Sequence, residues 1–209
     1  MIEVARTAGG SISLARGLLW LTLGWNIIEG VIAVSSGVVA GSVALVGFGL
    51  DSFIEVTAAG VLLWRLGVME HDEAAQRREA TAHRVVGVTF IVLAIYIVAQ
   101  VAYTLALGGQ PEESQVGLAL AIVSLMAMPV IGLLKRWNAQ RIGSRALVAE
   151  SSETLICSYL SLVLFIGLGA NAAFGWWWAD VAAALAMVPW IVREGLEGIR
   201  GESCADDCD

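Results

Sequence analysis

Two pairs of side chains in this sequence have the types and the spacing of metal ligands. Asp51 and Glu55 are four residues apart, and so are Glu153 and Cys157. Residues four apart share one face of a helix. Two helices that face each other through these pairs would bring three carboxylates and a thiol together. This donor set suits a tetrahedral divalent ion such as Zn²⁺, or Cd²⁺ because a thiolate is soft, whereas Mn²⁺ and Fe²⁺ would gain less from the thiol.

The positions of the flanking arginines predict that the two pairs lie at matching depths. Glu55 is ten residues before Arg65, which follows the second apolar stretch. Glu153 is eight residues after Arg145, which precedes the fifth. At the helical rise these separations are about 15 Å and about 12 Å. Asp51 and Cys157 lie one turn deeper, at about 21 Å and about 18 Å. In helices of opposite direction the four side chains therefore meet.

The composition indicates that these residues lie in a membrane. Of 209 residues, 58% are hydrophobic and 15% are charged, with a mean hydropathy of +0.78, whereas a soluble domain is about 45–50% apolar and about 25% charged. The net charge of −7 argues against a nucleic-acid binder, and three cysteines exclude a disulfide scaffold. We predict an all-α integral membrane bundle, because six stretches have the length and apolar character of spans: Gly17–Ser35, Gly37–Trp64, Val85–Leu107, Val116–Leu134, Ala146–Ala170 and Trp176–Val192.

The basic residues predict one orientation for this bundle. All twelve Lys and Arg residues lie before the first stretch, after the sixth, or in the second and fourth connections. The positive-inside rule then places both termini in the cytoplasm. No Lys or Arg is expected deep in a span, so the intramembrane carboxylates lack basic partners. An ionisable group in hydrocarbon costs a few kcal/mol and is a functional-site candidate by default.

Three further acidic residues lie in or at the edges of the predicted spans. Glu29 fits either a proton or secondary metal path or a structural hydrogen bond, with Asn26 on nearly the same face as its partner. Glu150 fits a secondary site too, but its place near the cytoplasmic end also suits solvation or pairing with Arg145. Asp180 begins the sixth stretch, where a helix N-cap is the favoured role.

Two polar segments carry further candidate ligands. Cys204 and Cys208 lie with four carboxylates in the last eight residues. This tail would capture metal at the cytoplasmic mouth or be merely solvated, and a disulfide is not expected in that compartment. His71 lies among acidic residues in the connection between the second and third spans, which fits a second metal site or an ordinary solvated loop.

At these residues the sequence resembles the cation diffusion facilitator (cation efflux) family. The run Gly41-Ser42-Val43-Ala44-Leu45 leading to Asp51 looks like that family's second helix. Ala149–Glu153 looks like the start of its fifth helix, and Trp178–Asp180 like the start of its sixth. The resemblance implies a transport site with one i, i+4 pair from helix two and one from helix five. It also implies a homodimer that exports Zn²⁺ or related ions by alternating access coupled to protons.

The transport site carried over from the family is Asp51, Glu55, Glu153 and Cys157, with departures from the usual pattern. Glu153 and Cys157 stand where the family usually has His and Asp, and Glu55 stands where it has Asp, so the ion cannot be copied from zinc-selective members. We expect residues 1–200 to form the six-helix domain and residues 201–209 a short acidic cytoplasmic tail, without the family's cytoplasmic C-terminal domain. A dimer would then form through the membrane helices.

The sequence therefore predicts a multi-pass cell-membrane protein that exchanges a divalent metal, Zn²⁺ first, for protons. Its ligands bind metal only when deprotonated, so metal release and protonation are alternatives at one site. The alternatives are a non-transporting metal-binding or sensing protein, and a transporter of Cd, Fe, Mn, Co or Ni. An enzyme is not expected, because a Cys157 nucleophile needs a base, usually His, and His71 and His83 lie in a connection. No organic cofactor and no nucleic-acid partner are expected.

Overall fold

The computed structural model describes residues 2–65 and 73–200, and within these ranges the chain is helical without a strand. The predicted all-α class is confirmed. Cys204, Cys208 and His71, with the tail to which the two cysteines belong, lie outside the described residues. The helices are α1 (Ile2–Ala40), α2 (Val43–Arg65), α3 (Glu73–Leu107), α4 (Gln115–Ile142), α5 (Arg145–Phe174) and α6 (Trp178–Arg200).

Five of the six helices, α1 to α5, are long and apolar enough to cross a membrane. The sixth predicted span does not reach the same apolar character. Its helix, α6, has 23 residues and carries these charged side chains: Asp180, Arg193, Glu194, Glu197 and Arg200. These charged residues, which lie near both ends of α6, make it less apolar than the five candidate spans.

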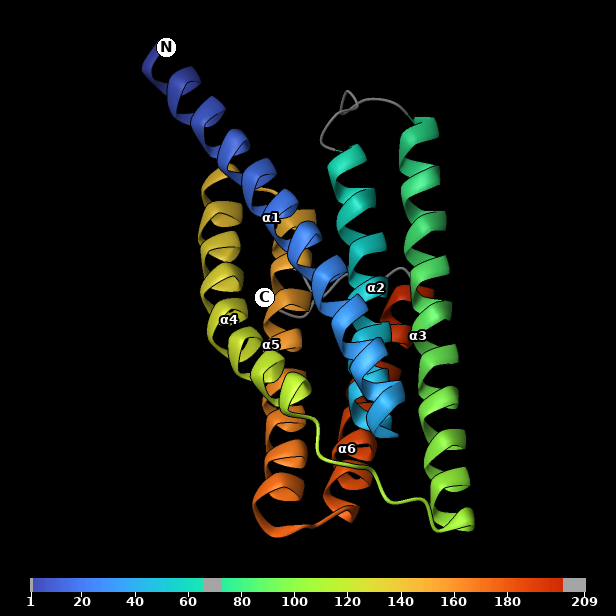
Figure 1. The fold of residues 1–209 in the computed structure, drawn as a ribbon. Helices are drawn as coiled ribbons and strands as arrows, with labels where there is room; N and C mark the ends of the chain where they lie inside the picture. The colour runs from blue at the N-terminus through green and yellow to red at the C-terminus, as the bar shows by residue number, and fades with distance from the viewer. Residues whose placement is uncertain (1, 66–72, 201–209) are drawn as a thin grey trace.

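Successive helices run in opposite directions (Figure 1). The start of α1, the end of α2, the start of α3, the end of α4 and the start of α5 lie at one end of the bundle, and α6 runs back towards it. α2 packs against α1, α3, α5 and α6 and is the most buried of the candidate spans. Side chains on α2 therefore face protein on several sides, which is where polar groups can be held inside a membrane.

The first predicted break, at residues 35–37, is wrong, because α1 continues to Ala40. The hydroxyls of Ser35 and Ser36 each donate to a backbone carbonyl one turn back, at 2.6 Å. Serines bonded in this way remain inside a helix. The turn comes instead at Gly41, whose φ of +65° is in the left-handed region that glycine occupies without strain.

The predicted basic connection between the fourth and fifth spans is also helical for most of its length. α4 continues to Ile142, and Gly143 at φ +68° caps its end. Ser144 then caps α5, with its side chain accepting from the Leu147 backbone N–H at 3.3 Å. The connection is therefore a two-residue turn, and Lys135 lies within a helix.

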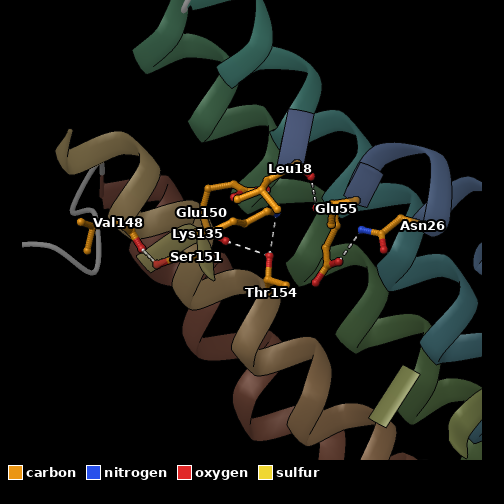
Figure 2. A network of polar contacts seen from close by, with 9 residues as sticks. Leu18, Asn26, Glu55, Lys135, Val148, Glu150, Ser151 and Thr154 are labelled. Carbon is orange, nitrogen blue, oxygen red and sulfur yellow. Dashed lines mark hydrogen bonds and ion pairs between the residues drawn. The ribbon is translucent and has the colours of Figure 1, made fainter. Parts of the chain in front are cut away.

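Lys135 is fully buried between α4 and α5, so the expectation that no cation lies deep in a span is wrong. Its Nζ donates to Glu150 Oε1 at 2.6 Å and to Thr154 Oγ1 at 3.0 Å (Figure 2). Glu150 is buried and pairs with Lys135, so its expected solvation is wrong. The side chain of Arg145, the other partner considered from sequence, lies outside the described side chains. A buried cation persists because a carboxylate and a hydroxyl satisfy it at short range.

Asp180 caps a helix other than its own. It is fully buried in the first turn of α6. Its Oδ1 accepts from Ser42 Oγ at 2.5 Å and its Oδ2 from the Val43 backbone N–H at 3.0 Å. The first N–H groups of a helix have no partner within it, so a carboxylate from α6 completes the start of α2. Asp180 therefore caps a helix, as expected, but the helix is α2 and not its own helix α6.

Small residues bring α3 and α6 into close contact. A Cβ atom on Gly87 would lie 2.7 Å from the carbonyl oxygen of Gly195 and 2.7 Å from the backbone nitrogen of Ile199. Close backbone approach through glycine is a common way for helices to associate in membranes. Glu194 directly precedes Gly195, so this contact between α3 and α6 also fixes the position of Glu194.

Replacing Gly87 by Ala is expected to destabilise the bundle by about 1–3 kcal/mol, because the added methyl group meets backbone atoms that can move only with the helix. Gly60→Ala is the matched control, since a Cβ there has no atom within 4 Å and alanine favours the helix by up to about 1 kcal/mol. Thermal unfolding in detergent, followed by circular dichroism, measures both. Equal midpoints would contradict the tight crossing.

Lys135→Met is expected to destabilise the protein by about 3–5 kcal/mol, because it leaves the Glu150 carboxylate buried without its cation. The double variant Lys135→Met/Glu150→Leu should recover most of this loss, since Thr154 keeps its bond to the Glu150 backbone carbonyl. Urea or thermal unfolding of the single and double variants tests the coupling. A double variant as unstable as the single one would show that the pair is not the cause.

Candidate metal centre

α2 and α5 bring three of the predicted ligands together. One ligand atom each from Asp51, Glu55 and Cys157 lies within 4.8 Å of the others. All three residues are buried, with exposed fractions of 3%, 8% and 0%. We call these three residues the inner cluster. Two carboxylates and a thiol at this spacing are a donor set for a divalent ion of intermediate softness.

The side chain of Glu55 is positioned from α1. Asn26 Nδ2 donates to Glu55 Oε2 at 2.6 Å (Figure 2). Asn26 therefore does not pair with Glu29, the partner considered from sequence. One oxygen of Glu55 is held by a neutral donor, which leaves the carboxylate its charge and its second oxygen for an ion.

Glu153, the fourth predicted ligand, lies beside the inner cluster and not within it. It lines a cavity of about 10 Å³ together with Asp51, Glu55 and a residue of α6, Glu194. The cavity has room for about one water-sized particle. The four residues predicted from spacing thus occupy one region, but they do not converge on one point.

Glu194 is the residue that sequence reasoning missed. It follows Arg193 at the end of the sixth predicted span, where a charged residue reads as a helix terminus. A usable signal was its spacing from Asp180, fourteen residues earlier on the same helix. Fourteen residues are close to four whole turns, so Glu194 lies on nearly the same face as a buried carboxylate.

Glu29 is fully buried one helix away from the inner cluster. Its Oε2 accepts from Ser52 Oγ at 3.1 Å, and its Oε1 accepts from the Ser124 hydroxyl. The hydrogen bonds of a structural carboxyl are therefore present, with hydroxyls of α2 and α4. Ser52 follows Asp51 in the chain, so this network connects α1 and α4 to the backbone that carries the inner cluster.

Buried negative charge exceeds buried positive charge around this region. Within residues 12–64, 84–144 and 147–200, Lys135 is the one buried cationic side chain, and it is paired with Glu150. The buried carboxylates include Glu29, Asp51 and Glu55. Charges removed from water need partners of opposite sign or protons. The centre is thus built for a cation or for protons.

Comparisons with known proteins show which family the chain matches. The family model for the cation efflux transmembrane domain matches residues 19–201. Transmembrane protein 163 of Xenopus laevis is 26% identical over 137 residues, which are 66% of this chain and 48% of that protein. The uncharacterized transporter sll1263 of Synechocystis sp. is 24% identical over 204 residues, which are 91% of this chain and 66% of that protein.

The chain therefore spans about half of the first relative and 66% of the second. The family match covers all of α2 to α6 and most of α1, including every residue of the inner cluster. This match extends over far more than half of the chain, and the protein belongs to the cation efflux family.

Proposed function

We propose that this protein transports a divalent metal cation across a membrane, exporting Zn²⁺ from the cytoplasm in exchange for protons. The observation that carries the proposal is the inner cluster, in which Asp51, Glu55 and Cys157 lie within 4.8 Å of one another inside a bundle of apolar helices. Glu153 is the candidate for a fourth ligand from the adjoining cavity. A buried cluster of this kind would hold an ion inside the bundle and not at its surface.

Exchange for protons follows from the chemistry of the same groups. Carboxylates and a thiol coordinate a metal when deprotonated, so metal and protons compete for the inner cluster. The surrounding deficit of cations means that an empty, fully charged cluster is costly. If metal occupies the cluster on the way out and protons occupy it on the way back, the cluster is never empty and fully charged during the transport cycle.

The orientation in the membrane supports the direction of export. With α6 as the sixth span and Lys135 set apart as a buried residue, the positive-inside rule assigns the side of the other eleven basic residues, and with it both termini, to the cytoplasm. Alternating access and a homodimer formed through the membrane helices complete the proposal. A non-transporting metal sensor is the second candidate, since the inner cluster alone would suffice for binding.

Purified protein in liposomes with an acidic interior is expected to take up Zn²⁺, and Asp51→Asn to take up no more than empty liposomes, because the variant removes an anionic ligand from the inner cluster. A zinc-responsive dye inside the liposomes measures uptake. Glu113→Gln is the matched control, because that carboxylate is exposed in a connection and its variant should transport like wild type.

Dissipating the pH gradient with a proton ionophore should reduce this uptake. The proposal fails if wild type moves none of Zn²⁺, Cd²⁺, Mn²⁺, Fe²⁺, Co²⁺ or Ni²⁺ above empty liposomes. Tight metal binding without uptake would favour the sensor. Uptake that is indifferent to the pH gradient would retain the transporter and remove proton exchange.

Cys157→Ser is expected to lower the preference for Cd²⁺ over Mn²⁺ by about tenfold or more, which is about 1.4 kcal/mol, because the hydroxyl is a harder donor than the thiolate. Competitive uptake of the two ions measures the ratio. Cys204→Ser/Cys208→Ser is the control for thiols outside the cluster, and this double variant should leave the ratio of Cd²⁺ to Mn²⁺ uptake unchanged. An unaltered ratio in Cys157→Ser would remove the thiol from the ligand set.

A further inference from the structure

Glu29 is a buried carboxyl that the proposed exchange of metal for protons leaves without a role. Its side chain is 0% exposed on α1, and between Arg16 and Asp51 it is the one charged residue of the sequence. It does not belong to the inner cluster, so it is not a candidate ligand of the ion. A carboxyl this far from water needs either a nearby positive charge or a proton.

Glu29 accepts hydrogen bonds from two serine hydroxyls, and a hydroxyl can accept a hydrogen bond as well as donate one. Ser52 Oγ lies 3.1 Å from Glu29 Oε2 and also 3.1 Å from the Phe48 carbonyl oxygen. Its single proton serves one of these two acceptors at a time. If Glu29 is ionised, Ser52 donates to it. If Glu29 is protonated, Ser52 can donate to Phe48 and accept the proton of the carboxyl group.

The other oxygen of Glu29, Oε1, contacts the Ser124 hydroxyl, so both contacts suit either protonation state with the same positions of the heavy atoms. Asp180 shows the contrast. It is also 0% exposed, but its Oδ2 accepts from the Val43 backbone N–H at 3.0 Å. A backbone N–H can only donate, and a hydrogen bond of this kind favours the ionised form of a carboxyl group.

The charges around Glu29 are those of the metal centre. The titratable groups close enough for their charges to interact with Glu29 are the three residues of the inner cluster, Asp51 and Glu55 of α2 and Cys157 of α5. On α4, which supplies Ser124, the nearest charged residue along the helix is Lys135, about 16 Å away by the helical rise. Lys135 is paired with Glu150, so it does not serve as the partner of Glu29.

The occupancy of the inner cluster therefore sets the charge that Glu29 experiences. A divalent ion there favours the ionised carboxylate, because the two attract each other through a medium of low dielectric constant. An empty cluster has the opposite effect, since the carboxylates of Asp51 and Glu55 repel a third negative charge. Glu29 can respond to both situations without a movement of the helices, because its serine partners suit both of its forms.

We propose that Glu29 is a proton-binding site of the transport cycle, separate from the metal ligands. Its carboxylic acid gives up one proton to water when the inner cluster takes up a divalent ion, and the carboxylate takes one proton back when the ion leaves. The inference rests on the proposed function, because it names one carrier of the exchanged protons. Glu29 acts on the ion through its charge and does not coordinate it.

The test measures metal binding and proton release in the same protein. In a Cys204→Ser/Cys208→Ser parent, Cys157 is the one remaining thiol of the sequence, so the ultraviolet thiolate-to-cadmium absorption reports filling of the inner cluster. The purified full chain in detergent is titrated with Cd²⁺ at a series of pH values. A pH-indicator dye in weakly buffered solution counts the protons released per bound ion.

Glu29→Gln keeps the size of the side chain and its hydrogen-bonding groups but cannot ionise. We expect it to bind Cd²⁺ like the parent at acid pH, where Glu29 is protonated with and without the ion. At alkaline pH it should bind roughly tenfold more weakly, because the parent then has one further negative charge near the ion. At intermediate pH it should release about one proton fewer per bound ion.

Two further variants serve as controls. Glu29→Asp keeps an ionisable group and should restore the pH dependence and the proton release of the parent. Glu113→Gln changes an exposed carboxylate and should match the parent throughout. A merely structural role of Glu29 would weaken binding in Glu29→Gln by the same factor at every pH and leave the proton count as it was.

Equal proton release and equal pH dependence in Glu29→Gln and the parent would overturn the proton site and leave the proposed function intact. A loss of affinity that is uniform across pH would overturn it too, since Glu29 would then be structural. If the parent bound Cd²⁺ without releasing protons, proton exchange itself would be wrong. If the parent gave no thiolate-to-cadmium absorption, the inner cluster would be wrong as well.

Infrared difference spectra decide the question if Glu29→Gln does not fold. The parent should lose a band of a protonated carboxyl group when Cd²⁺ binds, and Glu29→Asp should shift that band. A band that Glu29→Asp leaves in place would assign the proton to another residue and overturn the proposal.

Discussion

An excess of buried negative charge governs the design of this protein. Asp51 and Glu55 lie on a helix that is surrounded by protein, next to Cys157 and Glu29, and the buried cation identified nearby, Lys135, is already paired with Glu150. In a medium of low dielectric constant such an arrangement is unstable unless protons or a metal complete it. The same imbalance that makes the empty site costly makes the occupied site selective for cations.

The helices around α2 hold this charge in place through neutral donors. Asn26 of α1 fixes one oxygen of Glu55, and Ser52 and Ser124 hold Glu29. Neutral donors orient a carboxylate without cancelling its charge, so the attraction for a cation is preserved. Lys135 is kept to one side by Glu150 and Thr154, where it joins α4 to α5 and does not occupy the inner cluster.

The helical period predicted that Asp51, Glu55 and Cys157 meet, because i, i+4 pairs on antiparallel helices lie at similar depth, but it also predicted that Glu153 joins them, whereas Glu153 lies beside them. Partners across helices were not predictable in the same way. Asn26 and Glu29 share a face of α1, but the sequence does not say which neighbouring helix each one meets. Lys135 and Glu194 were missed for a related reason. A charged residue close to the end of an apolar stretch suggests a loop in the sequence. In the structure α4 continues past the predicted end of the fourth span, and α6 past the predicted end of the sixth.

The contact between Asp180 and the start of α2 has a consequence for the order in which the protein is completed during synthesis. The carboxylate and the backbone N–H groups that it binds are 137 residues apart in the chain. While the first five helices are being made, the start of α2 lacks its acceptor. The helix that carries the inner cluster is finished at its far end only when the last helix arrives. A chain stopped before α6 would have the candidate metal ligands of α2 and α5 without the hydrogen bond from Asp180 that completes the start of α2.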